Sequence, residues 1–474
     1  MLEPRALVRR IVGLRGGQPD AGPRLLDAGR GRGAPAPAGA PGPALLRRPD
    51  PPDALRPAPA AARGHRRPGP HHHRRPAPLR ALGGLGAERE TMQITPEVLA
   101  AAQTCPTPCL IIDPTVVRAK YHLVRASLAD VHVFYAVKAN PHPRVLQELA
   151  RQGCGFEVSS VQELTGVLAL GVTPDRIISS NPVKAPDFLA LAYAHGVRTF
   201  AYDSTTEIAK LARWAPGSRV YVRLAVDNTG SDWPLSRKYG VDAQTALALL
   251  DLAAERGLEP CGLTFHVGSQ CLNPANWENA LRLCAEVWQA AASRGLRLSL
   301  LNLGGGLPVR HLKPIPALVE IGQRVTALIR ALFPPDITLI IEPGRALVGD
   351  AAILVASVIG KAVRGDEHWL YLDAGVFNAL METIQGFGYE LWTERTGPVR
   401  RWTVAGPSCD SVDVLFNDVA LPELEVGDRL YVLNAGAYTL SYASSFNGFP
   451  PPAVFFLDEL LTTPAPVPVA PAAR

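Results

Sequence analysis

The sequence predicts an α/β protein in which a closed (β/α)8 barrel, a TIM barrel, is followed by an all-β domain of the barrel or sandwich type. First, eight apolar runs of strand length alternate with seven segments of helical periodicity between residues 132 and 345. Nearly continuous apolar strands indicate a parallel sheet covered by helices on both faces. Second, the count of eight favours a closed barrel over an open doubly wound sheet. Third, the helical periodicity fades beyond residue 351.

The barrel strands and helices can be placed individually. The predicted strands are 132–138, 154–160, 176–180, 198–204, 219–226, 261–269, 299–306 and 337–345. The helices between them are 143–152, 161–170, 185–195, 205–214, 242–256, 276–294 and 316–332. Glycines follow several helices, as left-handed C-caps would, at Gly153, Gly171, Gly196, Gly257 and Gly295. An open Rossmann-like sheet is the alternative, but GxGxxG is missing from the first strand–helix turn.

Further elements lie on both sides of the barrel. A short strand at 108–113 and a helix at about 114–129 precede it. Apolar runs between Gly, Pro and Asp turns predict later strands at 352–363, 369–373, 400–404, 429–433 and 453–457. The early strand is expected to pair with these later ones. We therefore assign 92–113 and 351–474 to the β domain, with the last few residues disordered, and 114–350 to the barrel.

The first part of the chain has a different composition. Residues 1–91 contain 17 Arg, no Lys and 7 acidic residues, a net charge of +10, whereas the whole chain carries +5 and residues 92–474 therefore −5. Its low-complexity runs of Pro, Ala, Gly and Arg cannot bury a core, which predicts a disordered extension. A transit peptide and a nucleic-acid-binding arm are the alternatives. Met92 opens the first segment of normal composition and could be the true start.

Several classes of protein are excluded by composition. No apolar run is long enough to span a bilayer, and no secretory signal is present. Seven scattered cysteines form no CxxC pair and no metal-ligand spacing. We expect reduced thiols, no metal site, no nucleic-acid or membrane partner, and a cytoplasmic location.

Polar residues or glycines stand at the carboxyl ends of the predicted strands, where such a barrel places its active site. Lys138 ends the first strand. Taken alone it would snorkel to solvent, but a partly desolvated amine with a lowered pKa would be suited to forming a Schiff base. The other strand ends carry Glu157, Ser179, Ser180, Asp203, Arg223, His266, Ser269, Gly304, Gly305, Gly306, Glu342 and Arg345.

The ends of the last two strands predict a phosphate site. A tight turn needs one or two glycines, whereas three stand at 304–306, and Gly344 lies beside a fixed cation, Arg345. No GxxxxGK[ST] motif is present, which argues against a nucleoside triphosphate. Pyridoxal phosphate needs an amine for its aldehyde, an anion site and a carboxylate that keeps its pyridine nitrogen protonated. Lys138, this phosphate site and Glu342 meet those needs, with His266 free to stack on the ring.

Seven ordered motifs resemble the fold-type III pyridoxal-phosphate decarboxylases, the alanine-racemase-like barrel family, over about residues 104–460. Within that family they look most like the bacterial ornithine/lysine decarboxylases. The motifs are Tyr135-Ala136-Val137-Lys138-Ala139-Asn140, Phe156-Glu157-Val158-Ser159-Ser160, His266-Val267-Gly268-Ser269, Gly304-Gly305-Gly306, Glu342-Pro343-Gly344-Arg345, Cys409-Asp410-Ser411-Val412-Asp413 and Gly436-Ala437-Tyr438.

The resemblance implies roles for individual residues. Lys138 would carry the cofactor, His266 would stack on its ring, and Glu342 would pair with the pyridine nitrogen in a network with Glu157 and Arg223. The phosphate would be held by Ser269, Gly304, Gly305, Gly306, Gly344, Arg345 and Tyr438.

The resemblance also implies a head-to-tail homodimer, because in this family the cysteine motif enters the active site of the other subunit. Cys409 would protonate the substrate Cα after CO2 leaves, and Asp410 would bind the distal ammonium of a diamino acid. Lys238 would pair with Asp413 across the interface. Asp373, in Leu372-Asp373-Ala374-Gly375, looks like the bacterial ornithine branch and is expected to contact substrate.

The implied activity is that of a lyase that decarboxylates L-ornithine to putrescine and CO2 in polyamine biosynthesis. Lysine differs by one methylene, worth about 1–3 kcal/mol of discrimination, and stays an alternative, with residues 377–383 shaping that end of the pocket. Diaminopimelate decarboxylase is the nearest rival, but its motif carries Glu where Asp410 stands. A catalytically inactive regulatory homologue would be expected to lack Lys138 or Cys409, and a racemase needs a second base opposite the lysine.

Overall fold

The computed structural model describes residues 91–234 and 237–462, all within one compact unit, Ala81–Arg474. The predicted disordered extension, apart from Thr91, and the last residues of the chain lie outside this described part. No helix in it is long and apolar enough to cross a membrane. It also contains no cluster of three or more His, Cys, Asp or Glu side chains that could hold a metal ion.

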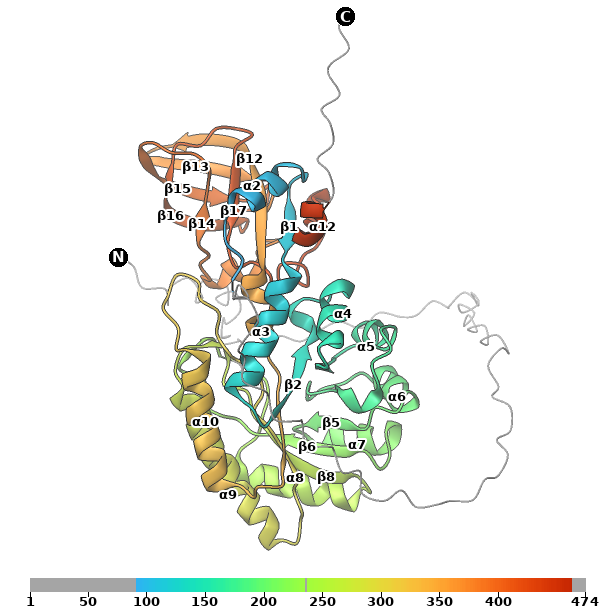
Figure 1. Ribbon diagram of the computed structural model, residues 1–474. Coiled ribbons are helices and arrows are strands. Elements are labelled where there is room, and N and C mark those ends of the chain that lie inside the picture. Colours follow the sequence, from blue (N-terminus) through green and yellow to red (C-terminus); the bar gives the residue numbers. More distant parts are fainter. Residues whose placement is uncertain (1–90, 235–236, 463–474) are drawn as a thin grey trace, which may run out of the picture. The chain divides into compact units, whose positions relative to one another are not determined.

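Eight parallel strands form the barrel, seen below the β domain in Figure 1. In hydrogen-bonded order they are β4 (Ile177–Ile178), β3 (Gly155–Glu157), β2 (Val131–Ala136), β11 (Thr338–Ile341), β10 (Leu300–Asn302), β8 (Glu259–Thr264), β6 (Arg219–Arg223) and β5 (Thr199–Tyr202). A parallel bridge between Ser179 and Phe200 joins the two end strands. The closed (β/α)8 barrel is therefore confirmed, and the open sheet is excluded.

The interior of the barrel is filled by side chains. One buried residue from each of six strands forms a separate apolar cluster, with Phe134 of β2 packed against it: Ile178, Ala201, Tyr221, Cys261, Leu300 and Ile340. Gly262 leaves no room for a side chain, since an added Cβ would lie 2.0 Å from the carbonyl oxygen of Leu300. The core of the barrel is thus closed to ligands, as is typical of this fold.

The predicted helices surround the barrel. They are α4 (Pro143–Arg151), α5 (Val161–Leu168), α6 (Pro186–Ala194), α7 (Thr205–Trp214), α8 (Ala243–Glu255), α9 (Ala275–Ser293) and α10 (Leu318–Leu332). The helix before the barrel, α3 (Pro114–Ser127), packs against both α10 and α4 and so takes the eighth outer position. All five predicted C-cap glycines have positive φ, between +74° and +89°. This confirms the helix ends read from the sequence.

The β domain contains the five predicted strands. They are β12 (Ala352–Arg364), β13 (Glu367–Leu372), β15 (Val399–Ala405), β17 (Arg429–Val432) and β18 (Ala453–Phe456). The sequence analysis missed β14 (Leu391–Trp392) and β16 (Val414–Pro422). Strand β16 contains Asn417 and Asp418, which resemble a turn, and Asp418 has φ +55° where the pairing with β15 is irregular.

Both ends of the described chain meet in this domain. Strand β1 (Cys109–Ile112) pairs antiparallel with β12 and parallel with β18. Helix α2 (Pro96–Gln103) packs against α12 (Leu457–Thr462). These pairings support our proposal that 92–113 and 351–474 form one domain around the barrel, 114–350.

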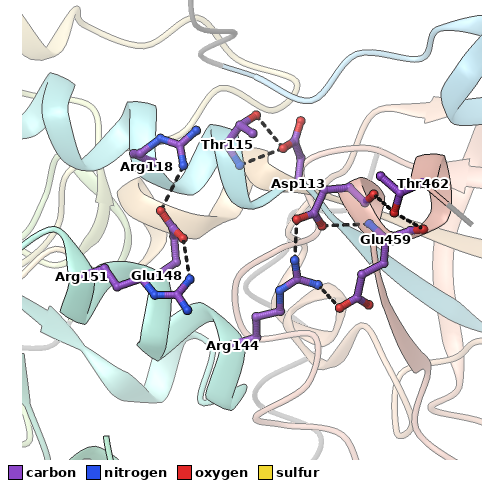
Figure 2. Close-up of polar contacts among 9 residues, drawn as sticks. Asp113, Thr115, Arg118, Arg144, Glu148, Arg151, Glu459 and Thr462 are labelled. Carbon is purple, nitrogen blue, oxygen red and sulfur yellow. Dashed lines mark hydrogen bonds and ion pairs between the residues drawn. The ribbon is translucent and has the colours of Figure 1, made fainter. Parts of the chain in front are cut away.

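Helix α12 also contacts the start of α4. Arg144 forms ion pairs with Asp458 and with Glu459, the second of which is labelled in Figure 2. Its guanidinium lies 4.3 Å from the centre of the Phe456 ring. The ring of His142, two residues earlier, lies 5.0 Å from the same phenylalanine. The end of the β domain therefore packs on the segment that follows Lys138.

Candidate active site

Lys138 lies in a short 3-10 turn (Val137–Ala139) directly after β2. Its neighbours Val137 and Ala139 are buried, whereas the lysine side chain is exposed because it projects into a cavity of about 400 Å³. This volume suits a small organic cofactor together with a substrate. The predicted site residues that line the cavity are Lys138, Glu157, His266, Ser269, Gly305, Gly306, Glu342, Gly344, Arg345 and Tyr438.

The amine of Lys138 is not held neutral. Desolvation by the surrounding cavity walls lowers the pKa of this amine, but the phenol of Tyr438 and the carboxylates of Glu157 and Glu342 together raise the pKa above its usual value. The lowered pKa expected from the sequence is therefore wrong. The reason is that acidic groups of other strand ends converge on the amine.

Glu342 directly follows β11 and is 9% exposed. Its Oε1 accepts hydrogen bonds from the hydroxyl of Ser180 and, at 2.6 Å, from Nδ2 of Asn302. Burial, together with the nearby Glu157, raises the pKa of Glu342 to about 7. A cation placed against this carboxyl would stabilise its ionised form, which is what a protonated pyridine nitrogen would supply.

His266 presents a neutral ring to the cavity. Its Nδ1 accepts a hydrogen bond from the backbone N–H of Gly268 at 3.0 Å, which places the proton of the neutral ring on Nε2. Burial, and then the charges of Arg223 and Lys138, hold its pKa well below the usual value. A flat, uncharged imidazole is suited to stacking on an aromatic cofactor.

The three glycines after β10 are required by close packing of the backbone. Gly304 and Gly306 have φ +64° and +104°, and added Cβ atoms would lie 2.0 Å from the Phe265 carbonyl oxygen and 2.5 Å from that of Gly268. At Gly305 the added atom would lie 2.8 Å from the Glu342 carbonyl oxygen. The premise that a turn needs at most two glycines is wrong here. The turn nevertheless lines the cavity with backbone alone.

Arg345, the first residue of α11 (Arg345–Val348), supplies a buried cation beside this turn. It is 3% exposed and donates to Glu382 at 2.5 Å, while its Nε has no hydrogen-bond partner among the described residues. The rings of Trp233, Phe387 and Tyr438 lie 4.9–5.3 Å from its guanidinium carbon. An unpaired buried N–H next to a bare glycine turn fits an anionic group.

Tyr438 lines the cavity beside Arg345 and next to the lysine turn. It has φ +66°, and its backbone N–H donates to the carbonyl of Ala139 at 2.7 Å, beside the lysine turn. An amine, a carboxyl without an ion pair, a neutral imidazole and an unsatisfied arginine N–H thus surround one cavity. These groups complement the aldehyde, ring nitrogen, ring face and phosphate of pyridoxal phosphate.

The family model described as the pyridoxal binding domain of pyridoxal-dependent decarboxylases matches residues 115–349. A lysine/ornithine decarboxylase of Selenomonas ruminantium is 38% identical over 370 residues, which are 77% of this chain and 93% of the relative. An ornithine decarboxylase of Schizosaccharomyces pombe is 34% identical and matches over 70% of this chain and 79% of its own length. This chain belongs to the pyridoxal-dependent decarboxylases. It is an enzyme of fold type III that uses pyridoxal phosphate.

Solved structures agree with this assignment. A crystal structure of lysine decarboxylase from Selenomonas ruminantium superposes with a TM-score of 0.73 at 36% identity, covering 78% of this chain and 97% of the other. A lysine/ornithine decarboxylase from Vibrio vulnificus, complexed with putrescine, gives a TM-score of 0.71 at 31% identity. The match covers 76% of this chain and 97% of the Vibrio chain. The fold and the bacterial lysine/ornithine branch suggested by the sequence are thereby confirmed.

Arg223 of this decarboxylase, at the end of β6, does not line the cavity. Its guanidinium carbon lies 5.3 Å from the centre of the Tyr239 ring. Burial lowers its pKa against the opposing effects of Glu342 and Asp203. Its charge therefore acts on the same carboxyl as Ser180 and Asn302, within the network expected around Glu342.

Asp373, Cys409 and Asp410 are not brought to the cavity of their own chain. Asp373 follows β13 and accepts a hydrogen bond from the backbone of Ser357 at 2.8 Å; burial raises its pKa. The expected contact of Asp373 with substrate therefore finds no support in this geometry. Cys409 and Asp410 are exposed on the loop between β15 and β16.

Asp413 anchors that loop from within. It is 3% exposed, and its carboxylate accepts hydrogen bonds from the backbone of Val376 at 2.7 Å and from the hydroxyl of Ser408 at 2.6 Å. Glycines at 375 and 406 leave room for it, since a Cβ on either would lie within 2.4 Å of its oxygens. These bonds within its own chain fix the loop that carries Cys409 and Asp410, both of which are exposed. The pairing of Asp413 with Lys238 across an interface stays a prediction, because it requires a second copy of the chain.

Met381 and Glu382 line the cavity from within the segment 377–383 that was expected to shape the pocket, whereas the sequence analysis missed Trp233, Leu307, Ile384, Gln385 and Tyr442. Trp233 belongs to a small two-stranded antiparallel sheet, β7 (Ser231–Trp233) with β9 (Ser269–Cys271), whose strands are far apart in sequence and have no alternating pattern. The carboxylate of Glu382 accepts from Arg345 and from the hydroxyl of Tyr389, the latter at 3.2 Å.

Proposed function

We propose that this decarboxylase acts on a basic L-amino acid, with L-ornithine as the favoured substrate and putrescine and CO2 as products. The cavity supports this: it brings Lys138, Glu342, His266 and Arg345 together. The names of the relatives support the substrate class, because they include ornithine and lysine/ornithine decarboxylases. The second candidate substrate is L-lysine, since the Selenomonas relative is named for both amino acids. In either case the product is a diamine for polyamine synthesis.

The cofactor would be held by groups that line the cavity and by Gly304, which begins the glycine turn but does not itself line the cavity. The amine of Lys138 would bind its aldehyde carbon, Glu342 would accept a hydrogen bond from its ring nitrogen, and His266 would cover one ring face. Its phosphate would contact Ser269, Gly304, Gly305, Gly306, Gly344, Arg345 and Tyr438. When bound, pyridoxal phosphate supplies the electron sink that takes up the electron pair left by departing CO2. Glu342 keeps that sink effective by favouring a protonated ring nitrogen.

The substrate's distal ammonium needs a carboxylate. On this chain Glu382 lines the cavity, where it forms an ion pair with Arg345. A second carboxylate, that of Asp410, would come from another subunit. Cys409 of that subunit would deliver a proton to the substrate Cα, and a neutral thiol can do so.

We also propose the homodimer that this arrangement requires. The cavity is rimmed by apolar side chains that a single chain leaves open, namely Met381 at 39%, Ile384 at 48% and Tyr442 at 51% exposure. The Cys409 loop is held outward by Asp413 and presents Val412, which is 50% exposed. A second copy that inserts this loop would cover the rim and complete two equivalent sites.

Mixing two inactive variants tests the shared site. Lys138→Ala and Cys409→Ala each inactivate their own homodimer, whereas a mixed dimer contains one site with both groups intact. Random reassociation should restore about a quarter of the wild-type activity. If the mixture stays inactive although subunits exchange, each chain uses its own cysteine.

The proposed location is the cytoplasm. All seven cysteines are free thiols, six of them buried and Cys409 exposed. An exposed thiol with a catalytic role is best preserved in a reducing compartment.

The substrate is tested by measuring amine products from ornithine, lysine, diaminopimelate and arginine in parallel. Putrescine should form with the highest kcat/KM and cadaverine with a lower one. Because one methylene is worth about 1–3 kcal/mol, the ratio should fall between about tenfold and two hundredfold. Consumption of diaminopimelate alone would refute the proposed role of Asp410.

A further inference from the structure

The carboxyl of Glu342 is held asymmetrically. Both hydrogen bonds that described residues donate to it reach the same oxygen, Oε1, from the hydroxyl of Ser180 and from Nδ2 of Asn302. No described residue donates to Oε2, and Glu342 lines the cavity. One oxygen is thus fixed by the protein and the other is left to the cavity.

Ser180 serves both glutamates of the site. Its hydroxyl donates to Glu342, and its backbone N–H donates to Oε1 of Glu157 at 3.2 Å. The hydroxyl of Tyr221, inside the barrel, lies 2.5 Å from the Ser180 oxygen. Since the Ser180 proton goes to Glu342, the Tyr221 hydroxyl donates to Ser180. The chain Tyr221–Ser180–Glu342 therefore runs in one direction.

Asn302 connects the carboxyl to the glycine turn. It is 0% exposed and ends β10. Its Oδ1 accepts from the backbone N–H of Gly304 at 2.9 Å, while its Nδ2 donates to Glu342. The bond from Gly304 fixes which end of the amide is the donor. One side chain thus joins the ring-nitrogen end of the cavity to its phosphate end.

We propose that Ser180 and Asn302 are positioning residues that fix Oε1 of Glu342 and thereby aim Oε2 at the ring nitrogen of the cofactor. Asn302 in addition sets the distance between this carboxyl and the turn at Gly304–Gly306. The inference rests on the proposed placement of pyridoxal phosphate and adds two residues that do not touch it.

The charged groups around Glu342 explain why its carboxyl needs hydrogen bonds that fix its orientation. The charged groups that face Glu342 are Glu157 from β3, Lys138 after β2 and Arg223 from β6. Two carboxyls and two cations at different strand ends would pull an unrestrained side chain to several orientations. Neutral donors orient the carboxyl without neutralising it, so its charge remains available to the ligand.

The adjacent serine provides a matched control. Ser179 is 0% exposed, like Ser180 it follows β4, and its hydroxyl has no hydrogen-bond partner among the described residues. Ser179→Ala and Ser180→Ala remove the same atom one residue apart. Only the second removal takes a donor from Glu342.

The experiment compares wild type, Ser179→Ala, Ser180→Ala and Asn302→Leu. Cofactor is removed, and the Kd for pyridoxal phosphate is measured by titration of the cofactor-free protein. The pH dependence of the absorbance of the bound cofactor is recorded, together with kcat and KM. Because hydrogen bonds to charged groups are lost, Ser180→Ala and Asn302→Leu should weaken cofactor binding by about tenfold or more. Their spectral pH profile should shift and kcat should fall, with KM for the amino acid nearly unchanged.

The outcomes distinguish a failure of the positioning role from a failure of the assignment of the cavity to pyridoxal phosphate. If Ser180→Ala matches Ser179→Ala in Kd, spectral profile and kcat, the positioning role is overturned; should Asn302→Leu fail to fold, the serine pair decides alone. If wild type itself binds no pyridoxal phosphate, the assignment of the cavity fails instead. Tyr221→Phe, one bond further from Glu342, should give a smaller shift in the same direction as Ser180→Ala.

Discussion

Two buried carboxyls of this decarboxylase have opposite surroundings. Glu207, near the start of α7, is 1% exposed and forms ion pairs with Lys184 at 3.0 Å and Lys210 at 2.6 Å. Glu342, at the end of β11, is 9% exposed and receives hydrogen bonds from neutral groups only. Within the part of the chain that the structure describes, no cation forms an ion pair with it.

The contrast distinguishes a structural charge from one kept for a ligand. Burial lowers the pKa of Lys184 to about 8 in spite of Glu207, yet its amine still has three acceptors, Glu207 and the carbonyls of Asn181 and Ala201. Glu207 and Lys184 satisfy each other and fasten the loop after β4 to α7. Glu342 has no such partner, and burial raises its pKa to about 7. A buried acid that receives hydrogen bonds only from neutral groups, with its nearest cations outside ion-pair distance, marks a place where a cationic ligand group can bind.

The largest effect is expected at the lysine of the cavity. Lys138→Ala removes the amine that would carry the cofactor and should lower kcat by at least about a thousandfold. After borohydride reduction, mass spectrometry should find pyridoxyl on the peptide with Lys138 in wild type and on no peptide of the variant. Lys210→Ala, at the structural carboxyl, is the control and should keep both label and turnover.

The structural pair should respond in stability. Lys184→Met leaves Glu207 buried with only Lys210, so unfolding in urea at pH 7 should show a loss of about 3–5 kcal/mol. Pyridoxal phosphate affinity of the folded variant should change little. A variant as stable as wild type would mean that Lys210 alone satisfies Glu207.

The pH dependence of stability should report Glu342. Because its pKa is raised from 4.5 to about 7 in the folded, cofactor-free protein, the folded state binds more protons than the unfolded state in this window. The contribution of Glu342 is therefore fully present below pH 4.5 and is lost as the pH rises to about 7, by on the order of 3 kcal/mol. Urea unfolding across this range should show the loss in wild type and a flatter profile in Glu342→Gln.

The same two carboxyls can be compared in catalysis by replacing each glutamate with glutamine. Glu342→Gln should reduce kcat/KM by about a hundredfold, because the ring nitrogen loses an ionised partner. Glu207→Gln should leave kcat/KM of the folded enzyme near wild type and lower the urea midpoint. Steady-state kinetics with ornithine measures both. Equal kinetic losses would remove the distinction drawn between the two carboxyls.

The order of the elements and the ends of the strands were predictable because they depend on local patterns. Apolar runs place Lys138, Glu157 and Glu342 at strand ends, and a parallel barrel gathers such ends on one face. The sign of the Lys138 pKa shift was not predictable, because it depends on which acids converge in space. Ser180 was recognised as a strand-end residue, but its two bonds to different glutamates cross the sheet and leave no local signal.

Other misses have the same origin. Asp373 stands in a family-like motif, but its backbone N–H and its carboxylate both form hydrogen bonds with the backbone of Ser357 in β12. Trp233 and Gln385 line the cavity from segments in which no periodicity points to a face. The exposure of Cys409 could not be read from its motif, since the acid that turns the loop outward, Asp413, is buried by the approach of Gly375 and Gly406.

The pairing of β1 with β12 and β18 has a consequence for synthesis of the chain. Strand β1 leaves the ribosome before any part of the barrel, but both of its partners follow the barrel in the sequence. Both edges of this apolar strand therefore stay unpaired while the barrel is synthesised. The second edge can pair only after β18, the last strand, has been synthesised. In a chain truncated before Ala453 that edge would stay permanently unpaired. Nascent or shortened chains could then associate through it.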